Sequence, residues 1–135
     1  MHKGVYAVGT PVLAREGWWM AAVLAAGPGA VLSHRAAAVL HGLLKYAGPS
    51  IEVTAPRRRE IPGLITYESD LAPDEVTLVD GIPVTTAART IIDCTAVCNE
   101  RALGHALNQL ELRQLYDPTG LQVLMERHRG RRGIA

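Results

Sequence analysis

The spacing of hydrophobic residues changes twice along this chain, and this change limits the possible folds more than any other feature. Apolar residues recur at every third or fourth position from 13 to 44, alternate in short runs from 51 to 84, and return to helical spacing after 85. The first spacing is typical of a helix with one buried face, and alternation is typical of a strand. Helices on both sides of a group of strands predict the α+β class.

The first group of helices consists of two segments. Residues 13–26 place apolar side chains on one face, and Gly27-Pro28-Gly29 then ends the helix. Ser33 is expected to cap a second helix by accepting a hydrogen bond in its first turn, and Gly48-Pro49 ends that segment. Two helices joined by a short turn predict a helical hairpin.

The central group is expected to form a small antiparallel sheet of about four strands. Residues 51–54 alternate in the way expected of a strand with one solvent-facing side, and residues 64–67 form the next strand. Ahead of these, the alternating run GVYAVG at residues 4–9 predicts a further strand near the start of the chain. A strand needs a partner for its backbone groups, so this first strand either pairs within the chain or invites another one.

A hairpin is predicted around Asp80-Gly81, a dipeptide that two-residue turns prefer. Its arms are residues 76–79 and 82–84. Pro83 has no N–H to donate to a ladder, so the second arm should be very short or at the sheet edge.

Three helices are predicted after the hairpin. The first is capped by Thr85 or Thr86 and reaches about residue 97, the second covers 100–115, and the third starts at Asp117-Pro118. We therefore expect three parts in the chain. They are a strand in residues 1–12, a single α+β domain over 13–129, and a flexible basic tail over 130–135.

The candidate metal ligands are two cysteines, Cys94 and Cys98, four residues apart on a predicted helix. With His105 they would supply three of the four ligands that structural zinc requires. Both cysteines also fall on the apolar face, where a free cysteine packs as a small hydrophobic residue, and this second interpretation is favoured. The sequence contains no nucleophile motif, phosphate-binding loop or HExxH motif, so we expect no catalytic residue, no metal and no cofactor.

The basic residues are the sharpest functional candidates. The net charge is only +1, so any affinity for nucleic acid must come from local clusters. The candidate phosphate contacts lie at a predicted turn, at the start of the second helix and near the C-terminus: Arg57, Arg58, Arg59, His34, Arg35, Arg129, Arg131 and Arg132. The alternative for the arginine run is a solvated turn that protects sheet edges.

A protein interface is the other candidate site. Trp18 and Trp19 widen the apolar face of the first helix, so this helix is either largely buried or contacts a partner. The longest apolar run, residues 18–26, is far shorter than a membrane span, and no signal peptide is recognisable. We therefore expect a cytoplasmic protein that does not bind membranes.

Three motifs, GVYAVG, GPGAVLSHR-AA and DGIPVTT-ART, together resemble a group of actinobacterial proteins similar to AbiEi-type antitoxins of type IV toxin–antitoxin systems. Many of these carry a C-terminal domain that resembles very-short-patch-repair endonucleases. The resemblance implies that the chain corresponds to the middle of this architecture, with GVYAVG as the wing of a winged helix-turn-helix. The family's recognition helix and nuclease carboxylates have no matching positions here.

The resemblance implies an antitoxin-like, non-catalytic regulatory module that binds nucleic acid weakly through its basic patches. The expected partner is DNA, with a cognate toxin or a second copy of the chain as further candidates. The alternative is a module for protein–protein interaction or self-association, belonging to a truncated protein of the endonuclease family.

Overall fold

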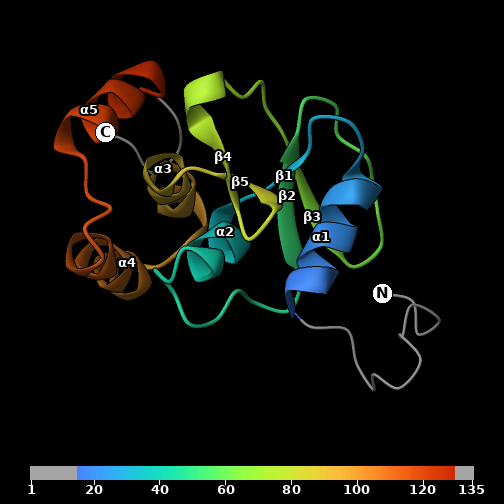
Figure 1. Ribbon diagram of the computed structural model, residues 1–135, viewed down its shortest axis with the longest axis horizontal. Helices are drawn as coiled ribbons and strands as arrows, with labels where there is room; N and C mark the ends of the chain where they lie inside the picture. The colour runs from blue at the N-terminus through green and yellow to red at the C-terminus, as the bar shows by residue number, and fades with distance from the viewer. Residues whose placement is uncertain (1–14, 130–135) are drawn as a thin grey trace.

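The computed structural model describes residues 15–129, in which helices lie on both faces of a five-stranded sheet (Figure 1). The helices are α1 (Arg15–Ala26), α2 (His34–Leu40), α3 (Ala87–Val97), α4 (Glu100–Leu112) and α5 (Pro118–Arg127). The strands are β1 (Val31–Leu32), β2 (Ile51–Ala55), β3 (Leu64–Glu68), β4 (Val76–Val79) and β5 (Ile82–Thr85), and a 3₁₀ turn, η2 (Pro73–Glu75), precedes β4. The α+β class predicted from the sequence is confirmed.

The sheet is mixed rather than antiparallel, which corrects the sequence-based expectation. Its strand order is β3-β2-β1-β5-β4. β2 and β3 run parallel over five residue pairs, from Ile51 with Leu64 to Ala55 with Glu68, and β1 pairs parallel with β5 through Leu32 and Val84. Residues 56–63 carry the chain back along the sheet, so that β3 enters from the same end as β2. β1 was not predicted, because two residues are too few to show alternation.

The predicted hairpin is confirmed. β4 and β5 pair antiparallel, and the turn residues Asp80 and Gly81 both have positive φ angles of 52° and 77°. A two-residue type I′ turn requires positive φ at both positions, and its twist matches that of the strands it joins. β5 is indeed short, but it lies inside the sheet between β1 and β4, and Pro83 pairs with Leu78 of β4.

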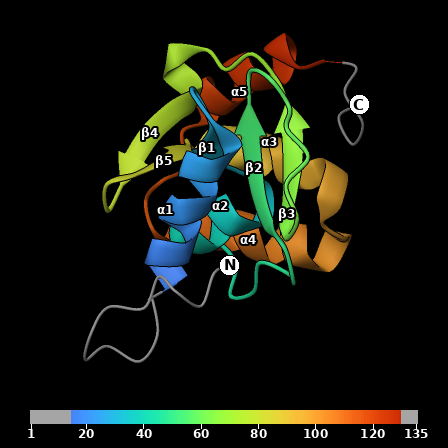
Figure 2. The ribbon, with the colours of Figure 1, turned by 90° about the vertical axis from the view of Figure 1, so that its right-hand side faces the viewer.

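Figures 1 and 2 show α1 on one face of the sheet and α2 with the three C-terminal helices on the other. β2 therefore has both faces covered, and its polar residues Glu52 and Thr54 are fully buried. The expectation that β2 has a solvent-facing side is wrong. The helical hairpin predicted for the first two helices is also wrong, because β1 separates them and enters the sheet. α2 lies between two clusters of buried apolar residues, since Ala36 and Ala37 pack with α1 and the sheet while Ala38 packs with α3 and α4.

The helix starts follow from local chemistry. The side chains of Thr86, Asn99 and Asp117 accept hydrogen bonds from backbone N–H groups at the starts of α3, α4 and α5. Ser33 is the N-cap of α2 but makes no capping hydrogen bond, so that part of the prediction is wrong. α2 also ends earlier than predicted, before Gly42, whose φ of 82° is incompatible with a continuing helix.

The predicted strand at residues 4–9 and the basic tail at 130–135 lie outside the described residues. Within residues 15–129, no helix is both long enough and apolar enough to span a bilayer.

Candidate functional site

A buried polar cluster at the start of α2 fixes the position of Arg35. The Glu52 carboxylate accepts hydrogen bonds from the Arg35 backbone N–H (2.9 Å), Arg35 Nε (2.9 Å) and Arg35 Nη2 (3.2 Å). Tyr67 on β3 donates its hydroxyl to the same carboxylate at 2.7 Å. Two hydrogen bonds from the guanidinium to one carboxylate leave it little freedom, and the Arg35 side chain remains 32% exposed.

The charge state of this cluster follows from its contacts. Burial acts to raise the pKa of Glu52, but the hydrogen bonds from Arg35 and Tyr67 outweigh burial and hold the pKa below its ordinary value. The bond to Glu52 raises the pKa of Arg35. Burial and the same carboxylate raise the pKa of Tyr67, so its hydroxyl stays protonated and able to donate. Glu52 and Arg35 are therefore an ion pair at neutral pH.

His34 is a buried member of the same cluster. It is 3% exposed, stacks on the Tyr67 ring with 3.7 Å between ring centroids, and has a positive φ of 55°. Its Nδ1 lies 2.8 Å from Ser33 Oγ, which also accepts a hydrogen bond from the Thr54 hydroxyl at 2.8 Å. The structure places His34 in the interior, where it supports Tyr67 instead of facing a phosphate.

The Arg35 side chain lines a cavity of about 790 Å³, which is formed by the segment after α2 and the junction between α3 and α4. Arg35, Lys45, Arg101 and His105 all line this cavity, together with Tyr46, Cys98 and Asn99. No aspartate or glutamate of residues 15–129 lines it. We call this space the cationic cavity.

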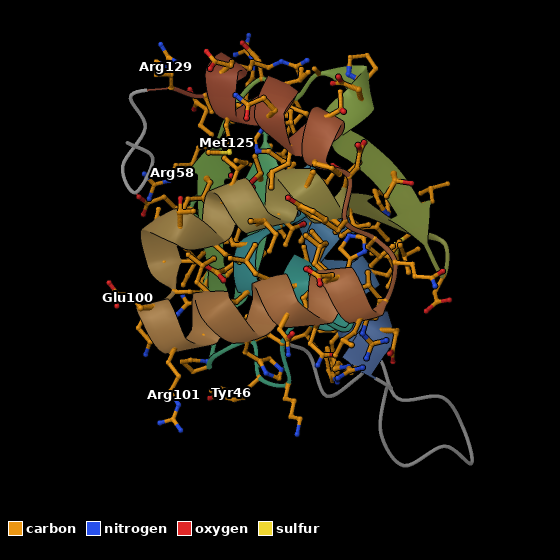
Figure 3. All side chains as sticks on the ribbon, turned by 90° about the vertical axis from the view of Figure 1, so that its left-hand side faces the viewer. Tyr46, Arg58, Glu100, Arg101, Met125 and Arg129 are labelled. Carbon is orange, nitrogen blue, oxygen red and sulfur yellow. The ribbon has the colours of Figure 1, made fainter. Side chains whose placement is uncertain are left out.

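Tyr46 stands at the mouth of the cationic cavity with 73% of its surface exposed. Figure 3 shows Tyr46 and Arg101 projecting from the same end of the molecule, below α4, with Arg129 at the opposite end. A second hollow of about 460 Å³ shares Lys45 and Tyr46 with the first and continues past Trp18 to Arg15 on α1. Positively charged and aromatic side chains line both hollows: Arg35, Lys45, Tyr46 and Arg101 line the first, and Arg15, Trp18, Trp19, Lys45 and Tyr46 line the second.

Cys98 lines the cationic cavity, while Cys94 is buried behind it. A hydrogen bond from the Cys94 thiol and the positive charge of Arg35 hold the pKa of Cys98 below its ordinary value, against the effect of burial. The same hydrogen bond and burial raise the pKa of Cys94. No group of three or more histidine, cysteine, aspartate or glutamate residues within 15–129 is arranged to hold a metal ion.

The other sequence-predicted residues lie elsewhere. Arg57, Arg58 and Arg59 are exposed between β2 and β3, and Glu60 (3.9 Å from Arg58) and Glu68 (3.1 Å from the Arg58 backbone) lie beside them. Arg129 is paired with Glu126 at 2.8 Å, and Arg131 and Arg132 lie outside the described residues. Trp19 belongs to the core with 3% exposure and Arg15 over its ring, and Trp18 is partly buried.

Sequence reasoning found Arg35 but missed Lys45, Tyr46, Arg101 and His105 as its neighbours. Two signals were available. Lys45 and Tyr46 directly follow the apolar positions of the second helix, and Arg101 and His105 are four residues apart, which places them on one helix face. Neither signal indicates that the two segments meet.

A second buried ionic cluster connects η2, α3 and α5. Glu75 contacts Arg89 (3.2 Å), Arg127 (3.4 Å) and His128 (2.6 Å), and Arg89 also pairs with Asp93 at 3.0 Å. Glu75, Arg89 and Asp93 each expose 1% or less of their side chains. Because no substrate can reach these groups, we assign this cluster a structural role.

Three comparisons of the chain with known proteins found no match. No family model matches the chain. No curated protein matches it, and no solved structure does.

Proposed function

We propose that this domain is a non-catalytic nucleic-acid-binding module of an antitoxin-like regulatory protein. The observation that carries the proposal is the cationic cavity, which four basic side chains line and no carboxylate of the described residues lines, although Glu52 behind it pairs with Arg35. On a chain with a net charge of +1, such local clustering creates a positive surface that the overall charge does not. Its regulatory, antitoxin-like role rests on the motif resemblance alone, and such a module would work in the cytoplasm.

Lys45 and Arg101 are the residues expected to contribute most of the attraction for phosphate. Both are exposed, and neither forms an ion pair within residues 15–129. Arg35 has a partner in Glu52, so its charge is largely offset, and its role is to offer N–H donors in a fixed position. Contacts of this kind hold the sugar–phosphate backbone and carry little sequence information.

The proposal is tested by fluorescence anisotropy with a labelled mixed-sequence oligonucleotide, supplied in single-stranded and in duplex form at low salt. Arg101→Glu should weaken binding at least fivefold and reduce the slope of log K against log salt by about 0.7–0.9, the value of one phosphate contact. Adding Lys45→Glu should weaken binding further. The matched control is Arg129→Glu, which makes the same charge change at the other end of the molecule, where Glu126 already neutralises the arginine (Figure 3).

Equal losses for Arg101→Glu and Arg129→Glu would mean that net charge alone governs binding, and no binding of either oligonucleotide by the unmodified protein would refute the proposal. The triple variant Arg57→Glu/Arg58→Glu/Arg59→Glu examines the second basic patch in the same assay. We expect a smaller loss per charge there, because Glu60 and Glu68 lie beside the run.

A protein-interaction module is the second candidate, and a separate surface favours it. Large apolar side chains that are at least 40% exposed lie along α4, the following loop and α5: Leu107, Leu112, Leu115, Tyr116, Val123 and Met125. Exposed apolar side chains on consecutive segments of a chain supply protein contacts where they adjoin one another. Light scattering after size exclusion separates the two candidates, because a monomer at high concentration would argue against self-association through this surface.

A further inference from the structure

We infer that the strip formed by the cationic cavity and its neighbouring hollow binds single-stranded rather than duplex nucleic acid, with one base stacked on Tyr46. This inference rests on the proposed function and specifies its ligand. The phosphates on either side of the stacked base would lie against Lys45 and Arg101, which line the same cavity as Tyr46.

The concave shape of the site is the first reason. Two hollows of about 790 and 460 Å³ meet at Lys45 and Tyr46, and each falls within the range of small-ligand pockets. A duplex is a stiff rod with its bases stacked inside, so it could touch only the rim of such a hollow. A base of a single strand can unstack from the neighbouring bases and enter the hollow.

The exposed ring of Tyr46 is the second reason. Tyr46 is 73% exposed and lines the same cavity as Lys45 and Arg101, neither of which forms an ion pair within residues 15–129. Its hydroxyl makes no hydrogen bond within residues 15–129, and no aromatic ring of that range stacks on it. Proteins that bind single strands combine aromatic rings for the bases with positive charges for the backbone in this way.

The chemistry of the lining predicts weak sequence preference. Glu52 takes up Arg35 Nε and Nη2, and Asn99 Oδ1 accepts from the Ala102 N–H, so both side chains have fewer polar atoms left to contact a base edge. Stacking and phosphate contacts do not distinguish one base from another. Phosphates and base faces are common to DNA and RNA, so strands of either kind should bind alike.

The test compares 12-nucleotide single-stranded DNA, RNA of the same sequence and the blunt DNA duplex by fluorescence anisotropy at one low salt concentration. Single strands should bind at least tenfold more tightly than the duplex. Tyr46→Ala should weaken single-strand binding by about five- to 150-fold, the value of one base–aromatic stack, and leave duplex binding unchanged. Tyr46→Trp should retain single-strand affinity.

Tyr116→Ala is the matched control, because Tyr116 is an exposed tyrosine outside both hollows. It should leave single-strand binding as it is. Duplex binding equal to or tighter than single-strand binding would overturn this inference and leave the proposed function intact. An unchanged single-strand affinity for Tyr46→Ala, in a variant with the parent's circular dichroism spectrum, would also overturn it. No binding of any of the three ligands would refute the proposed function as well.

Discussion

Glu52 is the residue on which the geometry of the cationic cavity depends. Its side chain is fully buried and accepts four hydrogen bonds from Arg35 and Tyr67. Glu52→Gln would remove the charge and leave Arg35 without its counter-ion, and breaking a fully buried pair costs about 3–5 kcal/mol. Arg35 is 32% exposed and water can take over part of its solvation, so we expect a loss of about 2–3 kcal/mol. Urea unfolding at pH 7 measures it.

The control for this prediction is Glu68→Gln, an exposed carboxylate that accepts from the Arg58 backbone. It should cost less than about 0.5 kcal/mol, since surface charges contribute little. A Glu52→Gln variant as stable as Glu68→Gln would show that the cluster does not hold the start of α2 in place.

The same residues show why the site could be predicted only in part. The sequence indicated Arg35 as a phosphate contact because it follows a predicted helix start, which is local information. It could not indicate that Glu52 is buried, because Glu52 sits in an alternating run whose polar positions ordinarily face solvent. Lys45 and Arg101 line one cavity because the α2 segment packs against α3 and α4, and this tertiary contact has no signal in a single sequence.

At the scale of elements, the helix starts were predicted where a side chain caps its own helix. Asp117 accepts from the Gly120 N–H at 3.0 Å and is followed by Pro118, so α5 begins where the sequence says. The parallel pairing of β2 with β3 was not predictable, because it depends on the path of residues 56–63 and not on the strands themselves. Local capping is therefore visible in the sequence, and strand direction is not.

Asp117 gives the prediction that belongs to this scale. Asp117→Ala removes the capping acceptor of α5 and should lower the free energy of unfolding by about 1 kcal/mol, whereas Asp117→Asn retains an acceptor and should lose only a few tenths. Thermal unfolding of the three proteins measures this difference. Equal losses for the alanine and asparagine variants would show that the cap does not stabilise α5.

At the scale of the whole molecule, ionisable groups join elements that are far apart in the sequence. Glu52 joins β2 to the start of α2, Glu75 joins η2 to α3 and α5, and His41 Nε2 donates to the Thr85 carbonyl of β5 at 2.7 Å. Burial lowers the pKa of His41 despite that hydrogen bond. Burial acts to raise the pKa of Glu75, but the hydrogen bond from His128 and its other partners lower it overall.

These shifts predict that acid destabilises the fold in two stages. A histidine whose pKa is lowered by folding binds its proton more readily when unfolded, so stability falls as pH drops below the ordinary histidine value of 6.5. Glu52 and Glu75, with lowered pKa values, stabilise the fold above the ordinary carboxyl value of 4.5 and lose that contribution as pH falls further.

The variant His41→Gln keeps an N–H donor for the Thr85 carbonyl but has no group that titrates in this range. Urea unfolding between pH 7.5 and 5.5 should therefore show a smaller decline for His41→Gln than for the parent. Equal declines would mean that His41 does not cause the first stage, and a second stage that persists unchanged in Glu52→Gln would remove Glu52 from the groups responsible.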